Sequence, residues 1–292
     1  MPADPSASLT LTIPVYNGAA FLDGTLSTAR AWLATRNTVA ELLVVDDCST
    51  DATAEVIRAF AARTENTDAV TFRHVRNERN RGKGFSLRRA FLLANGDHVV
   101  FTDADLTYGM HDVATIVGAL AGGADVAYGS RMHPDSRYVI APTFLPKLYT
   151  RHAMGRVFNH LARMAVVPGI RDTQAGLKGF RREAARAIAS RCRLDRFSFD
   201  VEMFFVARRL GLRIDECPVE FLYRKEPSTV RFATDSLRML RDMARIRCRG
   251  VRGVYDRPDP ALVRELTGAA SDPSIEPAPV ATRPAAEQRR LG

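Results

Sequence analysis

Two apolar segments of the chain end abruptly in aspartates. Residues 41–47 read ELLVVDD, and residues 98–105 read HVVFTDAD. A short run of apolar, β-branched residues is typical of a strand that is buried on both faces of a parallel sheet. Because ligands of open α/β sheets bind outside the carboxyl ends of the strands, we expect both acidic pairs to face one site.

The order of the patterns along the chain supports an α/β fold. Further strands are expected at residues 9–16, 69–75, 124–129, 176–180 and 213–223. Helices are expected at residues 19–36, 52–63, 84–95, 145–167, 201–210 and 235–249. Strands that alternate with helices favour a mostly parallel sheet covered by helices on both faces. We therefore predict a three-layer α/β/α sandwich with a Rossmann-like sheet, in a single domain over residues 9–256.

The two ends of the chain differ in composition from the rest. Residues 1–8 are polar and lack the basic and apolar segments of a signal peptide, so we expect a disordered N-terminus without an anchor. Residues 257–292 are rich in Pro, Ala and charge, so we expect a mostly disordered tail with a short helix at 261–266. No segment approaches the roughly 20 apolar residues that a spanning helix needs.

Basic residues outnumber acidic ones in this chain. The 42 Lys and Arg and 33 Asp and Glu give a net charge of +9. Such a charge suits nucleic acid, an anionic membrane or a phosphorylated substrate as partner. No RRM, KH or zinc-finger pattern is present, so we expect no nucleic-acid partner. The 4 cysteines lie far apart, which is typical of reduced thiols in the cytoplasm and argues against structural zinc.

The pair Asp103 and Asp105 favours metal chemistry. Two carboxylates one residue apart at a strand end suit Mg²⁺ or Mn²⁺ that is also held by a diphosphate. Such a cation would neutralise the charge of a departing nucleotide. A single aspartate pair at a strand end is often only a turn or cap, but two such pairs at sheet ends favour a binding site.

Seven short segments in a fixed order carry a family resemblance. Four are IPVYN at 13–17, VDDCSTD at 45–51, NRGKG at 80–84 and DAD at 103–105. Together they resemble family 2 glycosyltransferases, which implies the GT-A fold. The other three are GSR at 129–131, IRDTQAGLK at 170–178 and FDVE at 199–202. These are similar to the dolichyl-phosphate β-glucosyltransferase branch, close to the dolichol-phosphate mannose synthases, and the likeness covers residues 9–255.

The resemblance implies a set of residues that would hold a nucleotide sugar. They lie at strand ends and in the glycine-bearing loop: Pro14, Tyr16, Asn17, Asp46, Asp47, Lys83, Asp103, Ala104 and Asp105. Within this set, Asp47 would contact the base or ribose, and Lys83 would lie over the nucleotide. Asp103 and Asp105 would bind the metal. Gly18 stands where the family usually has Glu, so one contact to the donor is missing or replaced.

The resemblance also implies residues around the reacting groups. The expected catalytic residues are Asp105, Arg131, Asp172 and Asp200. Arg131 would bind a phosphate of the donor or the acceptor, because a guanidinium suits paired oxygens. Asp172, Gln174, Asp200 and Glu202 would shape the sugar and acceptor side. Asp200 and Glu202 are also explained as acidic residues that open a helix.

The family likeness implies an inverting hexosyltransferase that moves glucose from UDP-glucose to a polyprenyl or dolichyl phosphate. A phosphate monoester has a second pKa of about 6, so it needs no base near pH 7. A hydroxyl acceptor would need Asp172 or Asp200 as the base. The alternative is a soluble acceptor, such as a hydroxyl of a small metabolite or of a cell-envelope glycan precursor. A sugar-nucleotide pyrophosphorylase would need a Gly-rich loop with Arg after the first strand, where this chain has PVYNG.

Two of the expected helices bear on the location of the protein. Residues 145–167 and 235–249 combine an apolar stripe with several basic residues, as helices at a membrane surface do. Helices that pack their apolar stripe on their own domain show the same pattern. We expect a cytoplasmic protein that can lie peripherally at the inner face of an anionic membrane.

Overall fold

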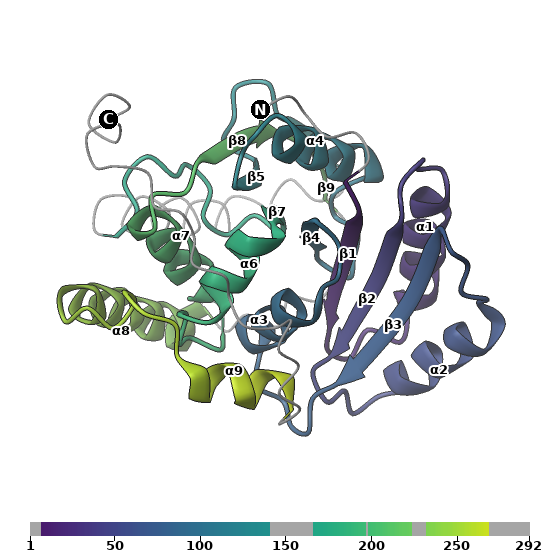
Figure 1. Ribbon diagram of the computed structural model, residues 1–292, viewed down its shortest axis with the longest axis horizontal. Coiled ribbons are helices and arrows are strands. Elements are labelled where there is room, and N and C mark those ends of the chain that lie inside the picture. Colours follow the sequence, from purple (N-terminus) through teal and green to yellow (C-terminus); the bar gives the residue numbers. More distant parts are fainter. Residues whose placement is uncertain (1–6, 141–165, 197, 224–231, 269–292) are drawn as a thin grey trace.

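The computed structural model describes residues 7–140, 166–196, 198–223 and 232–268. Its centre is a seven-stranded sheet in the order β3-β2-β1-β4-β7-β5-β8 (Figure 1). The strands are β1 (Leu9–Val15), β2 (Ala40–Asp46), β3 (Val70–Arg76), β4 (His98–Thr102), β5 (Val126–Ser130), β7 (Leu177–Arg181) and β8 (Ile214–Pro218). Helices cover both faces, so the predicted α/β/α sandwich is confirmed.

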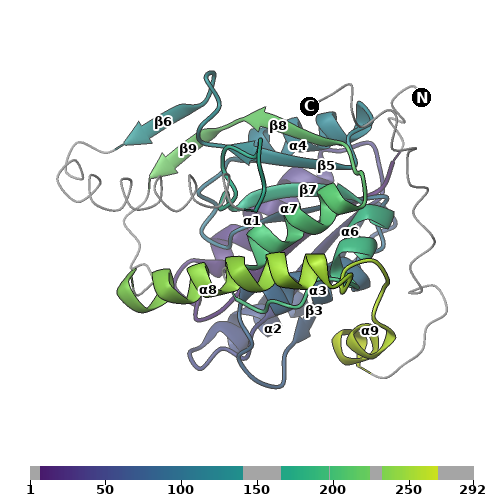
Figure 2. The same ribbon diagram turned by 90° about the vertical axis from the view of Figure 1, so that its left-hand side faces the viewer.

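Each face of the sheet has its own apolar core. One core lies under α1 (Leu22–Ala34), α2 (Thr53–Arg63) and α4 (Met110–Ala121). The other lies under α3 (Lys83–Leu93), α6 (Arg182–Ala189), α7 (Phe199–Arg209), α8 (Phe232–Val251) and α9 (Pro260–Thr267), which are in front in Figure 2. Successive side chains of a strand point to opposite faces, so Val100 joins the first core while Val99 and Phe101 join the second.

The direction of β7 decides what lies at the carboxyl edge of the sheet. β7 is antiparallel to both of its neighbours, β4 and β5. Its first residue, Leu177, pairs with Thr102, the last residue of β4. The segment that leads into β7 therefore lies beside the residues that follow β4 and β5. The sequence predicted this strand but not its direction.

Several elements differ from the expected ones. Helices α4 and α6 were not assigned from the sequence. The strand expected at 213–223 is divided: β8 ends at Pro218, and β9 (Glu220–Tyr223) pairs with β6 (Arg137–Ile140) in a separate parallel ribbon. Most of the helix expected at 145–167 lies outside the described residues, whereas α8 confirms the helix expected at 235–249.

The packed structure continues to α9. The Asp259 side chain accepts hydrogen bonds from the backbone N–H groups of Ala261 and Leu262, which caps the start of this helix. Leu262 and Leu266 are buried in the core beneath α3. The short helix expected at 261–266 is thus present, and it packs on the domain. Residues 1–6 and 269–292 lie outside the described residues, so the expected disorder and the domain boundaries stay predictions.

Among the residues that the structure describes, no helix combines the length and the apolar character needed to cross a membrane.

The contact between β7 and α4 predicts the effect of a single added methyl group. A Cβ at Gly179 would lie 2.4 Å from Cγ2 of Ile116. Overpacking of this kind costs about 1–3 kcal/mol, so Gly179→Ala should lower the free energy of unfolding by that amount. At Gly24, on α1, an added Cβ meets nothing within 4 Å. Gly24→Ala should raise the free energy by up to about 1 kcal/mol. Urea unfolding followed by circular dichroism measures both, and equal effects would contradict this packing.

Candidate active site

The loops that follow β1 and β2 are tied to each other. Oδ1 of Asn17 accepts a hydrogen bond from the backbone N of Thr50 at 2.8 Å, and the backbone N of Asn17 donates to Oγ of Ser49 at 2.9 Å. Asn17 and Cys48 have φ angles of 54° and 60°. Residues other than glycine keep such angles only where their surroundings hold them. The two loops therefore form a fixed wall, beside which the Tyr16 side chain is exposed.

Asp46 holds the end of β2 together. Its carboxylate is buried, and it accepts hydrogen bonds from the backbone N of Ser49 and from Nη1 of Arg76, both at 2.9 Å. These partners belong to the loop after β2 and to the end of β3. We expected Asp46 among the nucleotide-binding residues, and the structure shows it supporting the neighbouring loop.

Asp47 fixes the glycine-bearing loop. Its Oδ1 accepts from Nδ2 of Asn77 at 2.8 Å and from the backbone N of Arg81 at 3.0 Å. Its Oδ2 accepts from the backbone N of Gly82 at 2.6 Å. Asn77 was not among the expected site residues, and its only signal in the sequence is its position just after β3. Asp47 thus sets the path of the chain into α3.

Glycine is required at two positions of this loop. Gly82 has a φ of 102°, and a Cβ there would lie 2.7 Å from the carbonyl oxygen of Asp195. A Cβ at Gly84 would lie 2.5 Å from Cβ of Phe199, at the start of α7. The start of α3 is therefore pressed against neighbouring backbone. Arg81 adds a link to α9, since its Nη1 donates to Oε1 of Glu265 at 2.7 Å.

Lys83 connects the two acidic strand ends. Its Nζ lies 2.5 Å from Oδ1 of Asp103, and the preceding residue, Gly82, donates to Asp47. Burial lowers the pKa of Lys83, but the carboxylates of Asp103, Asp200 and Asp105 raise it more, so its pKa lies above the usual value. Lys83 is therefore a permanent cation between the ends of β2 and β4.

The Asp103 residue is bonded to the loop before β7 through its backbone, and its carboxylate packs closely against that loop. The backbone N of Asp103 donates to the carbonyl oxygen of Gly176 at 3.1 Å. A Cβ at Gly176 would lie only 2.0 Å from Oδ2 of Asp103. Only glycine at this position therefore lets the loop before β7 lie against the carboxylate.

The next two residues are also held in place. The carbonyl oxygen of Ala104 accepts from Oγ1 of Thr25 on α1 at 2.7 Å. Oδ1 of Asp105 accepts from the backbone N of Thr107 at 3.1 Å and from its hydroxyl at 2.5 Å. The carboxylate of Asp105 is thus oriented through one oxygen, which leaves Oδ2 as the oxygen for a ligand.

These carboxylates fit a metal site that is completed by a ligand. Among the residues that the structure describes, no three His, Cys, Asp or Glu side chains gather into a metal-binding group. Mg²⁺ takes about six oxygen ligands and usually keeps one or two carboxylates, with water and phosphate as the others. Asp103 and Asp105 match that demand, because a diphosphate would supply further oxygens.

Arg131 and Asp172 form a two-pronged ion pair at the end of β5. Nε and Nη2 of Arg131 lie 2.7 and 2.9 Å from the two carboxylate oxygens of Asp172. Burial raises the pKa of Asp172, but Arg131 lowers it more, so its pKa lies below the usual value. Burial likewise lowers the pKa of Arg131, and Asp172 reverses that shift. Both groups are therefore charged and engaged with each other.

Lys178 and Asp200 form a second, fully buried ion pair. Nζ of Lys178 lies 2.5 Å from Oδ1 of Asp200 and 2.6 Å from the carbonyl oxygen of Ala175. Burial lowers the pKa of Lys178, and Asp200 offsets only part of this shift. We expected Asp200 as a catalytic residue but gave Lys178 no role. The signal was present, because Lys178 is the one charged residue of the strand expected at residues 176–180.

Glu202 and Gln174 differ in their surroundings. Oε2 of Glu202 accepts from the backbone N atoms of Arg193 and Leu194, both at 2.7 Å, and Oε1 accepts from the Tyr255 hydroxyl. Burial raises the pKa of Glu202. Glu202 and Asp200 are two positions apart on α7, so their side chains point in nearly opposite directions. Glu202 therefore faces the core and not the side on which Asp200 lies. Nε2 of Gln174 is buried without a hydrogen-bond partner among the described residues, so it can still donate to a ligand.

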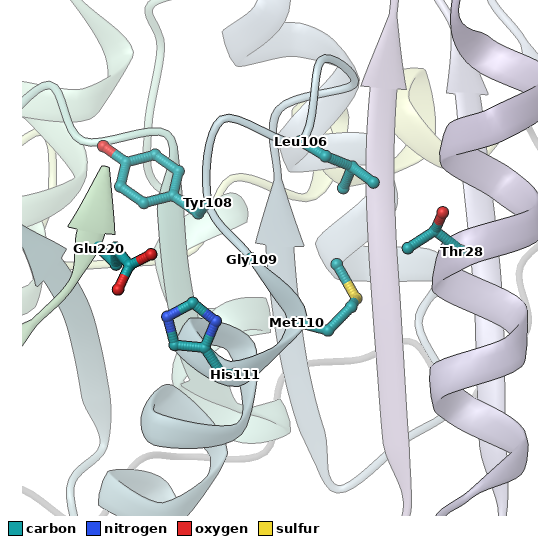
Figure 3. Close-up of a pocket in the computed structure, with 7 residues that line it drawn as sticks. All are labelled: Thr28, Leu106, Tyr108, Gly109, Met110, His111 and Glu220. Atoms are coloured by element: carbon teal, nitrogen blue, oxygen red, sulfur yellow. The ribbon is translucent and has the colours of Figure 1, made fainter. Parts of the chain in front are cut away.

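A cleft of about 190 Å³ lies beside the segment that follows Asp105 (Figure 3). Its lining comes from α1, the segment between Asp105 and α4, the start of α4 and the start of β9: Thr28, Leu106, Tyr108, Gly109, Met110, His111 and Glu220. None of these belongs to the predicted site residues. The Tyr108 hydroxyl points away from Thr28 and Met110 (Figure 3), and it interacts electrostatically with Arg131 and Asp172. Tyr108 therefore lines the cleft and also interacts with the ion pair at the end of β5.

Sequence comparisons relate the chain to known enzymes. Residues 10–189 match the family model described as Glycosyl transferase family 2. The dolichyl-phosphate β-glucosyltransferase of Drosophila melanogaster is 31% identical over 228 residues, which are 74% of this chain and 68% of that protein. The protein of the same name from Dictyostelium discoideum is 28% identical over 257 residues, or 85% and 76% of the two chains.

Solved structures show the same fold. Glucosyl-3-phosphoglycerate synthase from Mycobacterium tuberculosis in complex with UDP has a TM-score of 0.58 and 20% identity, over 88% of this chain and 83% of that one. The same enzyme with Mn²⁺, UDP and glucosyl-3-phosphoglycerate has a TM-score of 0.53 and 20% identity, over the same shares of both chains. The expected GT-A fold is therefore confirmed.

The buried pair at β5 predicts a pH-dependent loss of stability. Arg131→Met would leave the Asp172 carboxylate buried without the guanidinium that it faces. Breaking a buried pair costs about 3–5 kcal/mol, so the free energy of unfolding at pH 7 should fall by that amount. The lowered pKa of Asp172 means that the wild-type pair contributes above the unfolded value of about 4 and is lost as the pH falls below it. In the variant the buried carboxyl has lost its guanidinium partner and takes up a proton more readily, so the difference should shrink from pH 7 toward pH 4.

Urea unfolding at several pH values measures this difference. The matched control is Arg213→Met, because Arg213 pairs with Asp215 at the surface, where their side chains are 46% and 30% exposed. Its effect should stay within about 0.5 kcal/mol. A loss for Arg131→Met no larger than that of the control would contradict the assignment of a buried pair.

Proposed function

The chain belongs to glycosyltransferase family 2, and from this membership we propose that it transfers glucose from UDP-glucose to a polyprenyl phosphate with inversion at the anomeric carbon. The sugar and the acceptor come from the names of its relatives, the dolichyl-phosphate β-glucosyltransferases. The observation that carries the proposal is the pairing of both candidate bases, Asp172 and Asp200, with cations.

The donor would lie along the ends of β1, β2 and β4. Asp103 and Asp105 would hold Mg²⁺ or Mn²⁺ together with the diphosphate, as two carboxylates that directly follow β4. The relative from Mycobacterium tuberculosis with this fold was solved with Mn²⁺ and UDP. A bound divalent cation supplies charge neutralisation to the departing nucleotide. Lys83 would add a positive charge at the same place, next to Asp103.

The acceptor side favours a phosphate over a hydroxyl. A hydroxyl must lose a proton as it attacks, which requires a carboxylate that is ready to accept it. Asp172 is bound to Arg131 with a lowered pKa, and Asp200 is bound to Lys178 in the interior. Neither carboxylate is therefore a good base. A phosphate monoester is largely a dianion near pH 7 and brings its own nucleophilic oxygen.

Arg131 would position that phosphate. Nε and Nη2 already bind Asp172, and among the described residues Nη1 has no hydrogen-bond partner. Nη1 is therefore the donor that can reach an anionic oxygen. In a direct displacement, the phosphate oxygen forms a bond to the anomeric carbon while the bond from that carbon to UDP breaks. No proton is transferred in this step, and UDP carries away the electron pair of the broken bond.

The activity predicts a selective loss in one variant. Asp105→Asn keeps an acceptor for Thr107 but removes the negative charge. Loss of one such stabilising charge should lower transfer from UDP-glucose to polyprenyl phosphate by at least about 100-fold. The assay follows radiolabel that passes from UDP-glucose into lipid extracts, and EDTA should abolish it for the wild type. The control Asp135→Asn changes a carboxylate that is 81% exposed and should keep full activity.

Parallel incubations separate the acceptor classes. Label in the lipid fraction, with none on soluble hydroxyl acceptors, is the expected result. Label on a soluble acceptor alone would overturn the lipid assignment and leave the family activity intact. Full activity of Asp105→Asn in EDTA would overturn the metal-assisted chemistry.

We also propose that α8 lies against an anionic membrane, where a polyprenyl phosphate is found. Met243 and Ile246 of α8 are buried in the core, which fixes the opposite face outward. That outward face carries Arg241 near the exposed apolar residues Leu240 and Val251, and the exposed Arg252 directly follows the helix. Figure 2 shows α8 as an outer helix on its side of the sheet. Mixed basic and apolar faces of this kind suit lipid headgroups.

Charge reversal tests this surface. Each Arg near an anionic leaflet contributes about 1 kcal/mol, so the double variant Arg241→Glu/Arg252→Glu should bind vesicles at least about tenfold more weakly. Sedimentation with vesicles that contain phosphatidylglycerol measures the binding, and vesicles of phosphatidylcholine alone give the background. The matched control is Arg58→Glu/Arg63→Glu on α2, at the other face of the sheet, which should bind as the wild type does. Equal losses in both double variants would assign the binding to net charge and not to α8.

A further inference from the structure

Lys83 lies where a metal ion would have to bind Asp103. Its Nζ is 2.5 Å from Oδ1 of Asp103. The other oxygen, Oδ2, lies so close to the backbone of Gly176 that a Cβ built there would be 2.0 Å away. Oδ1 is therefore the open oxygen of this carboxylate. A metal ion that binds Oδ1 would share this oxygen with the ammonium group of Lys83, and the two cations would repel each other.

We propose that Lys83 is the resident counterion of Asp103, and that it gives up this carboxylate to a divalent cation only when a diphosphate arrives to receive its ammonium group. This inference rests on the proposed function. It assigns to Lys83 a role in coupling the binding of the metal to the binding of the nucleotide, beyond contact with the nucleotide.

The surroundings of Lys83 limit where its ammonium group can go. A second carboxylate that acts on Lys83, that of Asp200, already binds Lys178 at 2.5 Å. Lys83 and Lys178 repel each other, which lowers the pKa of Lys178. Both ammonium groups lie 5.2 Å from the ring centroid of Phe101, so they approach the same ring. A second cation at Asp200 would therefore be unfavourable, and the oxygens of an incoming diphosphate are the available anions.

A coupling between the two ligands follows from this arrangement. A metal ion that binds without nucleotide must displace Lys83 from Asp103. Among the described residues, the other carboxylates that act on Lys83 are Asp200, which binds Lys178, and Asp105, which would bind the same metal ion, so metal alone binds weakly. With a diphosphate present, the metal ion would bind the Asp103 carboxylate and the diphosphate would bind the Lys83 ammonium group. By thermodynamic reciprocity, the metal then raises the affinity for the nucleotide by the same factor as the nucleotide raises the affinity for the metal.

Metal binding without turnover tests the inference. Titration of the full chain with Mn²⁺, followed by the electron paramagnetic resonance signal of the free ion, gives the affinity with and without UDP. Removing a charge a few Å from a carboxylate changes its affinity for a cation at least about tenfold, so Lys83→Met should bind Mn²⁺ alone that much more tightly than the wild type. The factor by which UDP raises the affinity for Mn²⁺ should be smaller in Lys83→Met by the same amount. Lys83→Gln serves as a second neutral variant if Lys83→Met does not fold.

Two controls isolate the contact with Asp103. Lys83→Arg keeps the charge and should keep the weak binding of Mn²⁺ alone. Arg89→Met removes a positive charge from the same helix, but from a side chain that donates to Asn77, so it should leave Mn²⁺ binding within about twofold of the wild type. If Lys83 only held Asp103 in position, Lys83→Met would weaken the binding of Mn²⁺. Weaker or unchanged binding overturns the inference.

Failure of the inference differs from failure of the proposed function. A wild-type chain that binds no Mn²⁺, with or without UDP, would contradict the metal-dependent donor site itself. In another outcome, UDP tightens Mn²⁺ binding by the wild type, but Lys83→Met binds Mn²⁺ without UDP as weakly as the wild type does. That result would contradict only the role of Lys83.

Discussion

Charges of opposite sign alternate along the carboxyl edge of the sheet, where buried and partly buried side chains form ion pairs. Arg131 faces Asp172, Lys178 faces Asp200, and Lys83 faces Asp103. The pairs interact with one another, since Lys178 senses Asp172 and Lys83 senses Asp200. A site built in this way offers cations to incoming phosphates, and it leaves few carboxylates free to accept a proton. The balance suits a reaction between two anionic substrates better than one that begins with an alcohol.

Most of the fold could be predicted because hydrophobic patterns identify strands that are buried on both faces. Segments such as 41–47 and 98–102 read clearly, and β2 and β4 lie there. The direction of β7 could not be predicted, because a hydrophobic pattern looks the same for a parallel and an antiparallel strand. The direction appears only in the pairing of β7 with β4, in which Leu177 lies opposite Thr102. The division of 213–223 into β8 and β9 also depends on the distant partner of β9, β6.

The site was predictable in part. Its aspartates stand at strand ends, where the sequence alone shows them, and Gly82 links Asp47 to Lys83 and Asp103 as one group. The sequence could not show which groups hydrogen-bond to each carboxylate. Asp46 and Glu202 satisfy backbone and core partners, whereas Asp105 keeps an oxygen for a ligand. The need for Gly176 is likewise a matter of contact across the sheet, since it depends on the approach of Asp103.

Anomalous diffraction from crystals grown with Mn²⁺ and UDP is the most direct test of the central claim, that this edge binds a nucleoside diphosphate through a cation. The account predicts one strong manganese peak between the carboxylates of Asp103 and Asp105, in contact with the diphosphate, and the Lys83 ammonium group moved from Asp103 to a phosphate oxygen. A peak elsewhere, or UDP bound away from both aspartates, would contradict it.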